Sequence, residues 1–138
     1  MEVTDLIPQR FPLQLLDRII AVQPGVSATA EKLVTINEWF FQSPTLTGRT
    51  MIRPVLLEIL AQTGVVALLS MPEHHGNNVF FGGIRQADFK TDVCPGDRLE
   101  AMVTLTKLRR QIGTGHGVIT CAGREVVSAD LTLSLIHI

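Results

Sequence analysis

The chain has 138 residues, of which 46% are hydrophobic and 18% are charged, with a formal net charge of -1. This length suits one domain over residues 1–138 and is too short for two of ordinary size, and the composition argues against disorder. Because 12 Lys and Arg nearly balance 13 Asp and Glu, bulk charge does not favour nucleic-acid binding. We therefore expect no nucleic-acid partner.

Cysteine use and the first residues indicate a reduced, cytoplasmic protein. Cys94 and Cys121 are too few for a disulfide framework or a four-ligand zinc site, so we expect no metal or other cofactor. Residues 1–10 lack the long apolar run of a signal peptide. The one long apolar stretch, residues 54–71, contains Glu58 and is shorter than the roughly 20 residues of a bilayer span. We expect a buried helix here and no membrane association.

The first part of the chain predicts a hairpin. Residues 13–22 are apolar and typical of a strand, and residues 27–36 predict a second strand after the Pro24-Gly25 break. Asn37 is a good cap for a short helical turn over residues 38–42.

Residues 43–53 read as a loop, and a long helix is predicted directly after them. Pro54 suits its first turn, and residues 55–69 are apolar on nearly every face, which is typical of a helix that is enclosed by the rest of the protein. After a loop at 72–78 the pattern predicts four more strands, at 79–87, 98–110, 113–122 and 125–135. The last two are joined by a tight turn at 122–124.

The order of these elements favours an α+β domain in which a curved antiparallel sheet wraps around one long buried helix. Such wrapping buries both partners and is known as the hot-dog arrangement. A single sheet around a single helix leaves its edges exposed, so we also expect a homodimer.

Glu58 is the residue most suited to chemistry, because ionised carboxylates are rarely buried without partners. It lies one turn into the apolar helix, with Gln62 one turn further along the same face. Burial would raise the pKa of Glu58, while the helix N-terminus would favour its charge. Two roles are open: general acid–base catalysis, or a carboxylate that caps the loop above it through backbone N–H groups.

Several segments together resemble the 3-hydroxyacyl-acyl-carrier-protein dehydratases of the FabZ type. They are Ile7-Pro8-Gln9-Arg10-Phe11-Pro12 with Leu15-Leu16-Asp17-Arg18, residues 34–42, Leu57-Glu58-Ile59-Leu60-Ala61-Gln62, Phe81-Gly82-Gly83-Ile84, residues 92–97, and Lys107-Leu108-Arg109. The resemblance covers nearly the whole chain and implies the hot-dog fold.

The resemblance also implies a reaction, in which 3-hydroxyacyl thioesters lose water to give trans-2-enoyl thioesters in fatty-acid or polyketide biosynthesis. The family site combines a loop His, which removes the C2 proton, with a Glu or Asp on the central helix of the partner subunit, which helps the hydroxyl leave. Carried onto this chain, the acid is Glu58, and the substrate-binding candidates are Arg53, Gln62, Phe81 and Gly82. The implied partners are an acyl-carrier-protein or coenzyme A thioester and a second subunit, in a dimer or a trimer of dimers.

The chain departs from the family pattern at the loop His. The family His precedes the acid by fourteen positions, and this position is Pro44 here. Proline has no group that accepts a proton. We expect the other histidines, which are His74, His75, His116 and His137, to be surface residues.

Arg53 also departs from the family, which has glycine at the start of the helix. Its backbone N–H is a candidate donor to the thioester oxygen, whereas its side chain is a candidate to fill the substrate tunnel or to pair with Glu58. The basic residues Lys107, Arg109 and Arg110, with Arg85 and Lys90, suit either an acidic carrier protein or a charged, protected strand edge.

Three functions remain open at this point. The first is a dehydratase-like protein whose chemistry is altered or shared, for example in a heterodimer with a His-bearing paralogue. The second is a hot-dog thioesterase that uses Glu58 as base or nucleophile. The third is a non-catalytic subunit that binds acyl thioesters.

Overall fold

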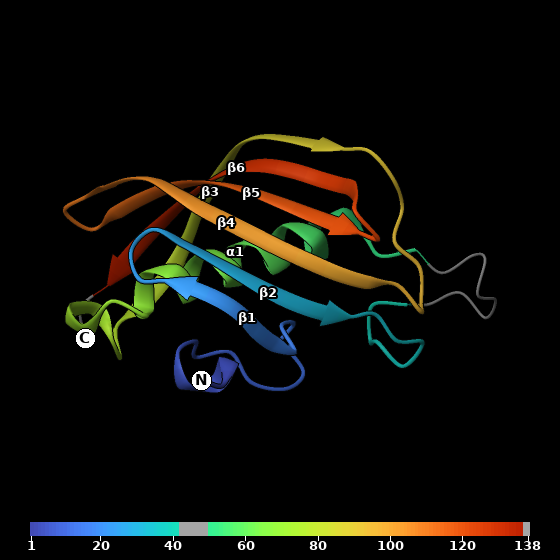
Figure 1. Cartoon of the computed structure of the whole chain (residues 1–138), viewed down its shortest axis with the longest axis horizontal. Coiled ribbons are helices and arrows are strands. Elements are labelled where there is room, and N and C mark those ends of the chain that lie inside the picture. Colours follow the sequence, from blue (N-terminus) through green and yellow to red (C-terminus); the bar gives the residue numbers. More distant parts are fainter. Residues whose placement is uncertain (42–49, 137–138) are drawn as a thin grey trace.

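The computed structural model describes residues 1–41 and 50–136. In this part of the chain one antiparallel sheet curves around one long helix, which confirms the predicted α+β hot-dog architecture (Figure 1). The elements are β1 (Arg18–Gln23), β2 (Ser27–Leu33), α1 (Arg53–Leu69), β3 (Asn78–Phe89), β4 (Arg98–Arg109), β5 (Ile112–Cys121) and β6 (Arg124–Ile136), with short 3-10 turns at Val3–Asp5 and Pro72–His74.

The strand order across the sheet is β1-β2-β4-β5-β6-β3, and all neighbouring pairs are antiparallel. The chain leaves the sheet after β2, passes through α1, and returns at the opposite edge as β3 (Figure 1). The two open edges of the sheet are therefore β1 and β3.

The helix α1 is buried along nearly its whole length, as its uniformly apolar sequence predicts. Ile59, Leu60 and Val66 have no exposed surface. The sheet covers one side, and buried residues of the N-terminal segment, among them Ile7 and Leu16, join the same core. None of the described helices is long and apolar enough to span a bilayer.

Glycines on β5 let the sheet approach α1 closely. The inward positions Gly113, Gly115 and Gly117 alternate along the strand and are all buried. A Cβ atom at Gly117 would lie 2.9 Å from Cδ2 of Leu60. Side chains of the helix thus occupy the space that side chains of the strand would normally fill.

The alternation predicted for the last strand is confirmed, and so is the turn before it. Val127, Leu131 and Leu135 on β6 are at most 2% exposed. Ala122 and Gly123 have φ values of 51° and 80° and form a two-residue turn between paired residues of β5 and β6, as expected for a tight hairpin.

Several predicted boundaries are wrong at the start of the chain. The first strand begins at Arg18 rather than at residue 13, because the backbone at Leu13 and Leu15 bonds to the side chain of Gln62 instead of to a strand. The second strand ends at Leu33 rather than at residue 36, because the backbone of Val34 pairs with the loop before β4.

The short helix predicted at 38–42 is a pair of turns as far as Phe41. Residues 42–49, which include most of the predicted loop, lie outside the described residues. The other edge strand, β3, is longer than predicted at both ends because it pairs with β6 from Asn78 to Phe89.

Candidate active site

Glu58 is half-buried in the first half of α1. Burial raises the pKa of its carboxyl above the usual value, and a hydrogen bond from Gln62 offsets part of this rise. Among the described residues no cation forms an ion pair with it. The carboxyl group is therefore tuned toward its protonated form, which suits a proton donor.

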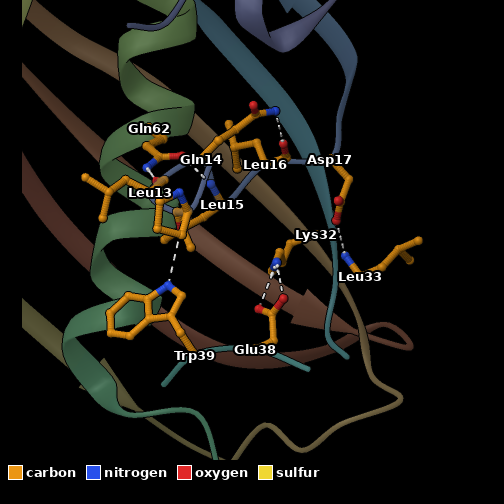
Figure 2. Close-up of polar contacts among 11 residues, drawn as sticks. Leu13, Gln14, Leu15, Leu16, Asp17, Lys32, Leu33, Glu38, Trp39 and Gln62 are labelled. Carbon is orange, nitrogen blue, oxygen red and sulfur yellow. Dashed lines mark hydrogen bonds and ion pairs between the residues drawn. The ribbon is translucent and has the colours of Figure 1, made fainter. Parts of the chain in front are cut away.

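Gln62 ties the N-terminal segment to the helix (Figure 2) and also holds Glu58 in place. Its amide nitrogen donates to the Leu13 carbonyl at 2.8 Å and to Oε1 of Glu58 at 3.2 Å, and its oxygen accepts from the Leu15 N–H at 3.0 Å. Only 1% of Gln62 is exposed. Both amide hydrogens are thus in use, and Gln62 acts here as a positioning residue; a direct contact with substrate stays a prediction.

Glu58 opens onto a cleft of about 390 Å³ whose walls are mostly apolar. The lining residues come from the N-terminal segment, the turn after β2 and the start of α1. They are Gln9, Leu13, Leu15, Trp39, Ile52, Pro54, Val55 and Glu58. A titratable group placed in an apolar cleft is the usual composition of a small-molecule site.

Trp39 forms one wall of this cleft and is held by contacts on two sides. Its indole N–H donates to the Pro12 carbonyl at 3.2 Å. The residue before it, Glu38, forms an ion pair at 2.9 Å with Lys32, whose side chain is only 6% exposed (Figure 2). The pair fixes the turn that carries the indole, because a buried charge keeps its partner close.

Arg53 lies at a different cleft from Glu58. Its guanidinium stands 4.7 Å from the ring centroid of Phe89, and both residues line a second cleft of about 330 Å³. The structure shows no ion pair between the described residues Arg53 and Glu58, which was one of the roles left open for this side chain. A role for the Arg53 backbone N–H stays a prediction; the helix cap at Ile52 makes no side-chain hydrogen bond among the described residues.

Phe81 and Gly82 lie on the edge strand β3 and do not line the Glu58 cleft. Gly82 sits at an irregularity where β3 has one residue more than β6 between paired positions, and Phe81 is 40% exposed. One chain alone therefore does not bring these two candidates to Glu58. Pro44, at the position of the family His, lies outside the described residues.

The described histidines do not replace that His at the Glu58 cleft. His75, beyond the end of α1, and His116 are exposed as expected, whereas His74 is half-buried and His137 lies outside the described residues. Nδ1 of His116 lies 2.9 Å from Asp130 on the neighbouring strand. None of the three lines the cleft. Among the described residues no group of metal-ligating side chains gathers either.

The basic residues divide into separate places. Lys107, Arg109 and Arg110 line a cleft at the end of the β4–β5 hairpin. Lys90 instead pairs with Glu125 at 2.6 Å. Since β2 pairs with β4 only as far as Thr104, the end of β4 that carries Lys107 and Arg109 has an open side, and both interpretations of these cations stay predictions.

The sequence analysis missed Leu13 and Trp39 as parts of the site. Leu13 directly follows residues 7–12 and Trp39 lies within residues 34–42, two segments that carry the family resemblance. The resemblance was therefore the signal that could have pointed to both. Apolar residues far apart in sequence give no local pattern that would place them on one cleft.

Comparison with known proteins agrees with this fold. The FabA-like domain model matches residues 7–130. The chain is 46% identical to the 3-hydroxyacyl-[acyl-carrier-protein] dehydratase FabZ of Roseiflexus castenholzii, over 97% of this chain and 94% of the relative. It is 42% identical to the FabZ of Ligilactobacillus salivarius, over 97% and 96% of the two chains.

Solved structures share the fold at lower identity. The dehydratase heterocomplex ApeI:P from Xenorhabdus doucetiae matches with a TM-score of 0.84 and 19% identity, over 99% of this chain and 92% of that one. A mutant of the thioesterase PA1618 from Pseudomonas aeruginosa matches with a TM-score of 0.67 and 15% identity, over 86% and 80%. Together with the sequence matches, these findings place the chain in the FabA-like family, among the FabZ-type hot-dog dehydratases.

Proposed function

We propose that this chain acts in fatty-acid biosynthesis on 3-hydroxyacyl thioesters carried by acyl carrier protein, as the subunit that supplies the acid of a dehydratase site. The observation that carries this proposal is Glu58, a half-buried carboxyl group with a raised pKa that opens onto an apolar cleft. Membership of the FabZ-type family supports the substrate class. We expect the protein to work in the cytoplasm.

In this reaction a base removes the C2 proton, and the electrons of that C–H bond form the C2–C3 double bond. The C3–O bond breaks at the same time, and the leaving hydroxyl takes the proton of Glu58 and departs as water. The products are the trans-2-enoyl thioester, water, the ionised carboxylate and the protonated base. Transfer of a proton from the base to Glu58 restores the starting state.

The base is the part of the site that this chain does not supply among its described residues. We propose that it is a His from a second, His-bearing dehydratase subunit, since Pro44 occupies the position of the family His. The open edge strand β3, with Phe80 59% exposed, is available to pair with another chain. That a chain of this fold occurs in a dehydratase heterocomplex supports such an assembly.

A thioesterase that uses Glu58 is the main alternative chemistry. It needs an ionised carboxylate as base or nucleophile. Burial shifts Glu58 in the other direction, toward the protonated acid. Membership of the FabA-like family and the similarity to FabZ dehydratases favour dehydration over hydrolysis.

The test is an assay on a 3-hydroxyacyl-acyl-carrier-protein substrate, following enoyl product and free thiol. The protein is assayed alone and mixed with a His-bearing FabZ paralogue from the same organism. We expect the mixture to form enoyl product faster than the paralogue alone, and Glu58→Gln in this chain to lower the gain about 100-fold or more. Glu73→Gln, on an exposed turn, is the control and should change nothing.

The other outcomes separate the alternatives. No gain over the paralogue alone contradicts the shared site. Free thiol that depends on Glu58 would establish a thioesterase instead. If neither product depends on this chain while an acyl thioester still binds, the chain is a non-catalytic binding subunit.

A further inference from the structure

Trp39 is the largest side chain on the wall of the Glu58 cleft, and its exposure is unusual. The residue is 58% exposed although it carries a large apolar ring, and most of the side chains that line the cleft with it are apolar as well. Exposed aromatic surface beside a cleft is surface that a ligand can cover. No other tryptophan occurs in the sequence.

The position of the indole is fixed relative to the acid by a continuous series of hydrogen bonds. The Trp39 indole N–H binds the carbonyl of Pro12. The carbonyl of the next residue, Leu13, binds the amide of Gln62, and the same amide binds Glu58. Figure 2 shows the Trp39, Leu13 and Gln62 contacts on one side of α1. The indole ring and the carboxyl group are therefore connected through residues 12–13 and Gln62.

The turn that presents the ring is also held from behind. Lys32 and Glu38 form an ion pair whose two side chains are 6% and 16% exposed. Phe40 packs against the indole edge-to-face, with ring centroids 5.3 Å apart. Little freedom remains to be lost when a ligand covers the ring, which favours binding.

We infer that Trp39 is a specificity-determining residue, and that the alkyl chain of the acyl thioester packs along its indole ring while the hydroxyl-bearing carbon lies at Glu58. This inference rests on the proposed function and deepens it. The chemistry of the wall selects the alkyl part of the substrate, because Leu13, Ile52 and Val55 offer it no polar partner. A longer chain covers more of the ring and gains more from burial.

Because Trp39 is the only tryptophan in the sequence, the fluorescence emission of the protein reports directly on this contact. The test titrates the full-length protein with octanoyl-pantetheine and with acetyl-pantetheine, which share the handle and differ in the alkyl chain. We expect octanoyl-pantetheine to shift the tryptophan emission to shorter wavelength, as water leaves the ring, and acetyl-pantetheine at equal concentration to leave the emission unchanged.

Variants measured by calorimetry complete the test. Trp39→Ala should weaken octanoyl-pantetheine binding about tenfold, the expected effect of losing one aromatic wall, and leave acetyl-pantetheine binding unchanged. Trp39→Phe retains a ring, tests a milder change and should give an intermediate loss. Ile20→Ala removes an apolar side chain that is 45% exposed on β1, away from the cleft, and should have no effect.

Binding without an emission change, or an equal loss for both probes in Trp39→Ala, would overturn the inference. Because no turnover is needed, the result is independent of the dehydratase assay. Octanoyl-dependent emission in a protein that forms no enoyl product would uphold the alkyl contact and reject the proposed chemistry.

Discussion

The amide nitrogen of Gln62 lies 3.2 Å from Oε1 of Glu58, one turn earlier on α1. The same amide binds the backbone of the segment that forms a wall of the cleft, at Leu13 and Leu15. One buried side chain thus determines both the orientation of the acid and the position of the wall. Changes at Gln62 should therefore affect stability and acidity together.

Removal of the Gln62 amide should destabilise the protein. In Gln62→Leu the Leu15 N–H and the Leu13 carbonyl lose their partner, and each unsatisfied buried group costs about 1–3 kcal/mol. We expect the free energy of unfolding in urea to fall by about 2–5 kcal/mol. The neighbouring Thr63→Val removes only a hydroxyl bonded within the helix, to Ile59 at 2.8 Å, and should cost about 1 kcal/mol. Equal losses of unfolding free energy in Gln62→Leu and Thr63→Val would show that the Gln62 amide does not hold the N-terminal segment against α1.

The same substitution should also move the acidity of Glu58. The hydrogen bond from Gln62 lowers the pKa of Glu58, so Gln62→Leu should raise this pKa further. Where Glu58 donates a proton, dehydratase activity falls as pH rises through its pKa, and this alkaline limb should lie at higher pH in the variant. An alkaline limb of the pH profile that stays in place in Gln62→Leu, or moves to lower pH, would contradict the assignment of Glu58 as the proton donor.

Glu58 should also make folding stability depend on pH. Burial raises the pKa of Glu58 in the folded protein above its ordinary value of 4.5, which applies to the unfolded chain. At a pH between the unfolded-state and folded-state pKa, the folded protein therefore binds the proton more tightly than the unfolded chain. The stabilisation is complete below pH 4.5 and is lost as pH rises through the folded-state pKa.

Urea unfolding of the wild type and of Glu58→Gln across this pH range measures the effect. The difference in free energy between them should move in favour of the variant as pH rises, because glutamine carries no charge to bury. Glu73→Gln is the control and should show no such trend. A pH-independent difference between Glu58→Gln and the wild type would show that the carboxyl is not desolvated.

The close approach of α1 to β5 predicts that Gly117→Ala is destabilising. The new methyl group would lie 2.9 Å from Leu60 and 3.2 Å from Val103, and overpacking of this kind costs about 1–3 kcal/mol. At Gly113, on the same face, the nearest atom would be at 3.5 Å, so Gly113→Ala should have a much smaller effect in thermal or urea unfolding.

The source of the cost can be tested with a double variant. Leu60→Ala alone should cost about 2–5 kcal/mol, and combined with Gly117→Ala it should cost less than the sum of the two, because the added methyl group then has room. Strict additivity would place the strain elsewhere than at Leu60.

The fold could be predicted from the sequence to the extent that a local pattern determined each element. The alternation along residues 127–135 and the apolar faces of residues 55–69 each identify one element directly. The segment 13–17 could not be predicted in this way. It is apolar and typical of a strand, but its backbone partner is a side chain, Gln62, that lies 47 positions away from Leu15.

The site was predicted only in part, for the same reason. Glu58 and Gln62 lie one helical turn apart, and this spacing alone places them together. Trp39, by contrast, reaches the cleft through Pro12 and the Lys32–Glu38 ion pair, which are tertiary contacts without a periodic signal. Arg53 was assigned from its place at the helix start, but the ring of Phe89 on a distant strand determines where its side chain lies.

The glycines on the inward face of β5 limit which substitutions in the core are compatible with the site. Since Gly113 and Gly117 contribute no side chains, the helix residues Leu60 and Leu68 fill part of the space between α1 and β5. Glu58 is two residues from Leu60, so a change of side-chain size there moves the acid together with the core. A substitution that improves the packing of the hydrophobic core at Leu60 is therefore tolerated only if it also keeps the Glu58 carboxyl group in position.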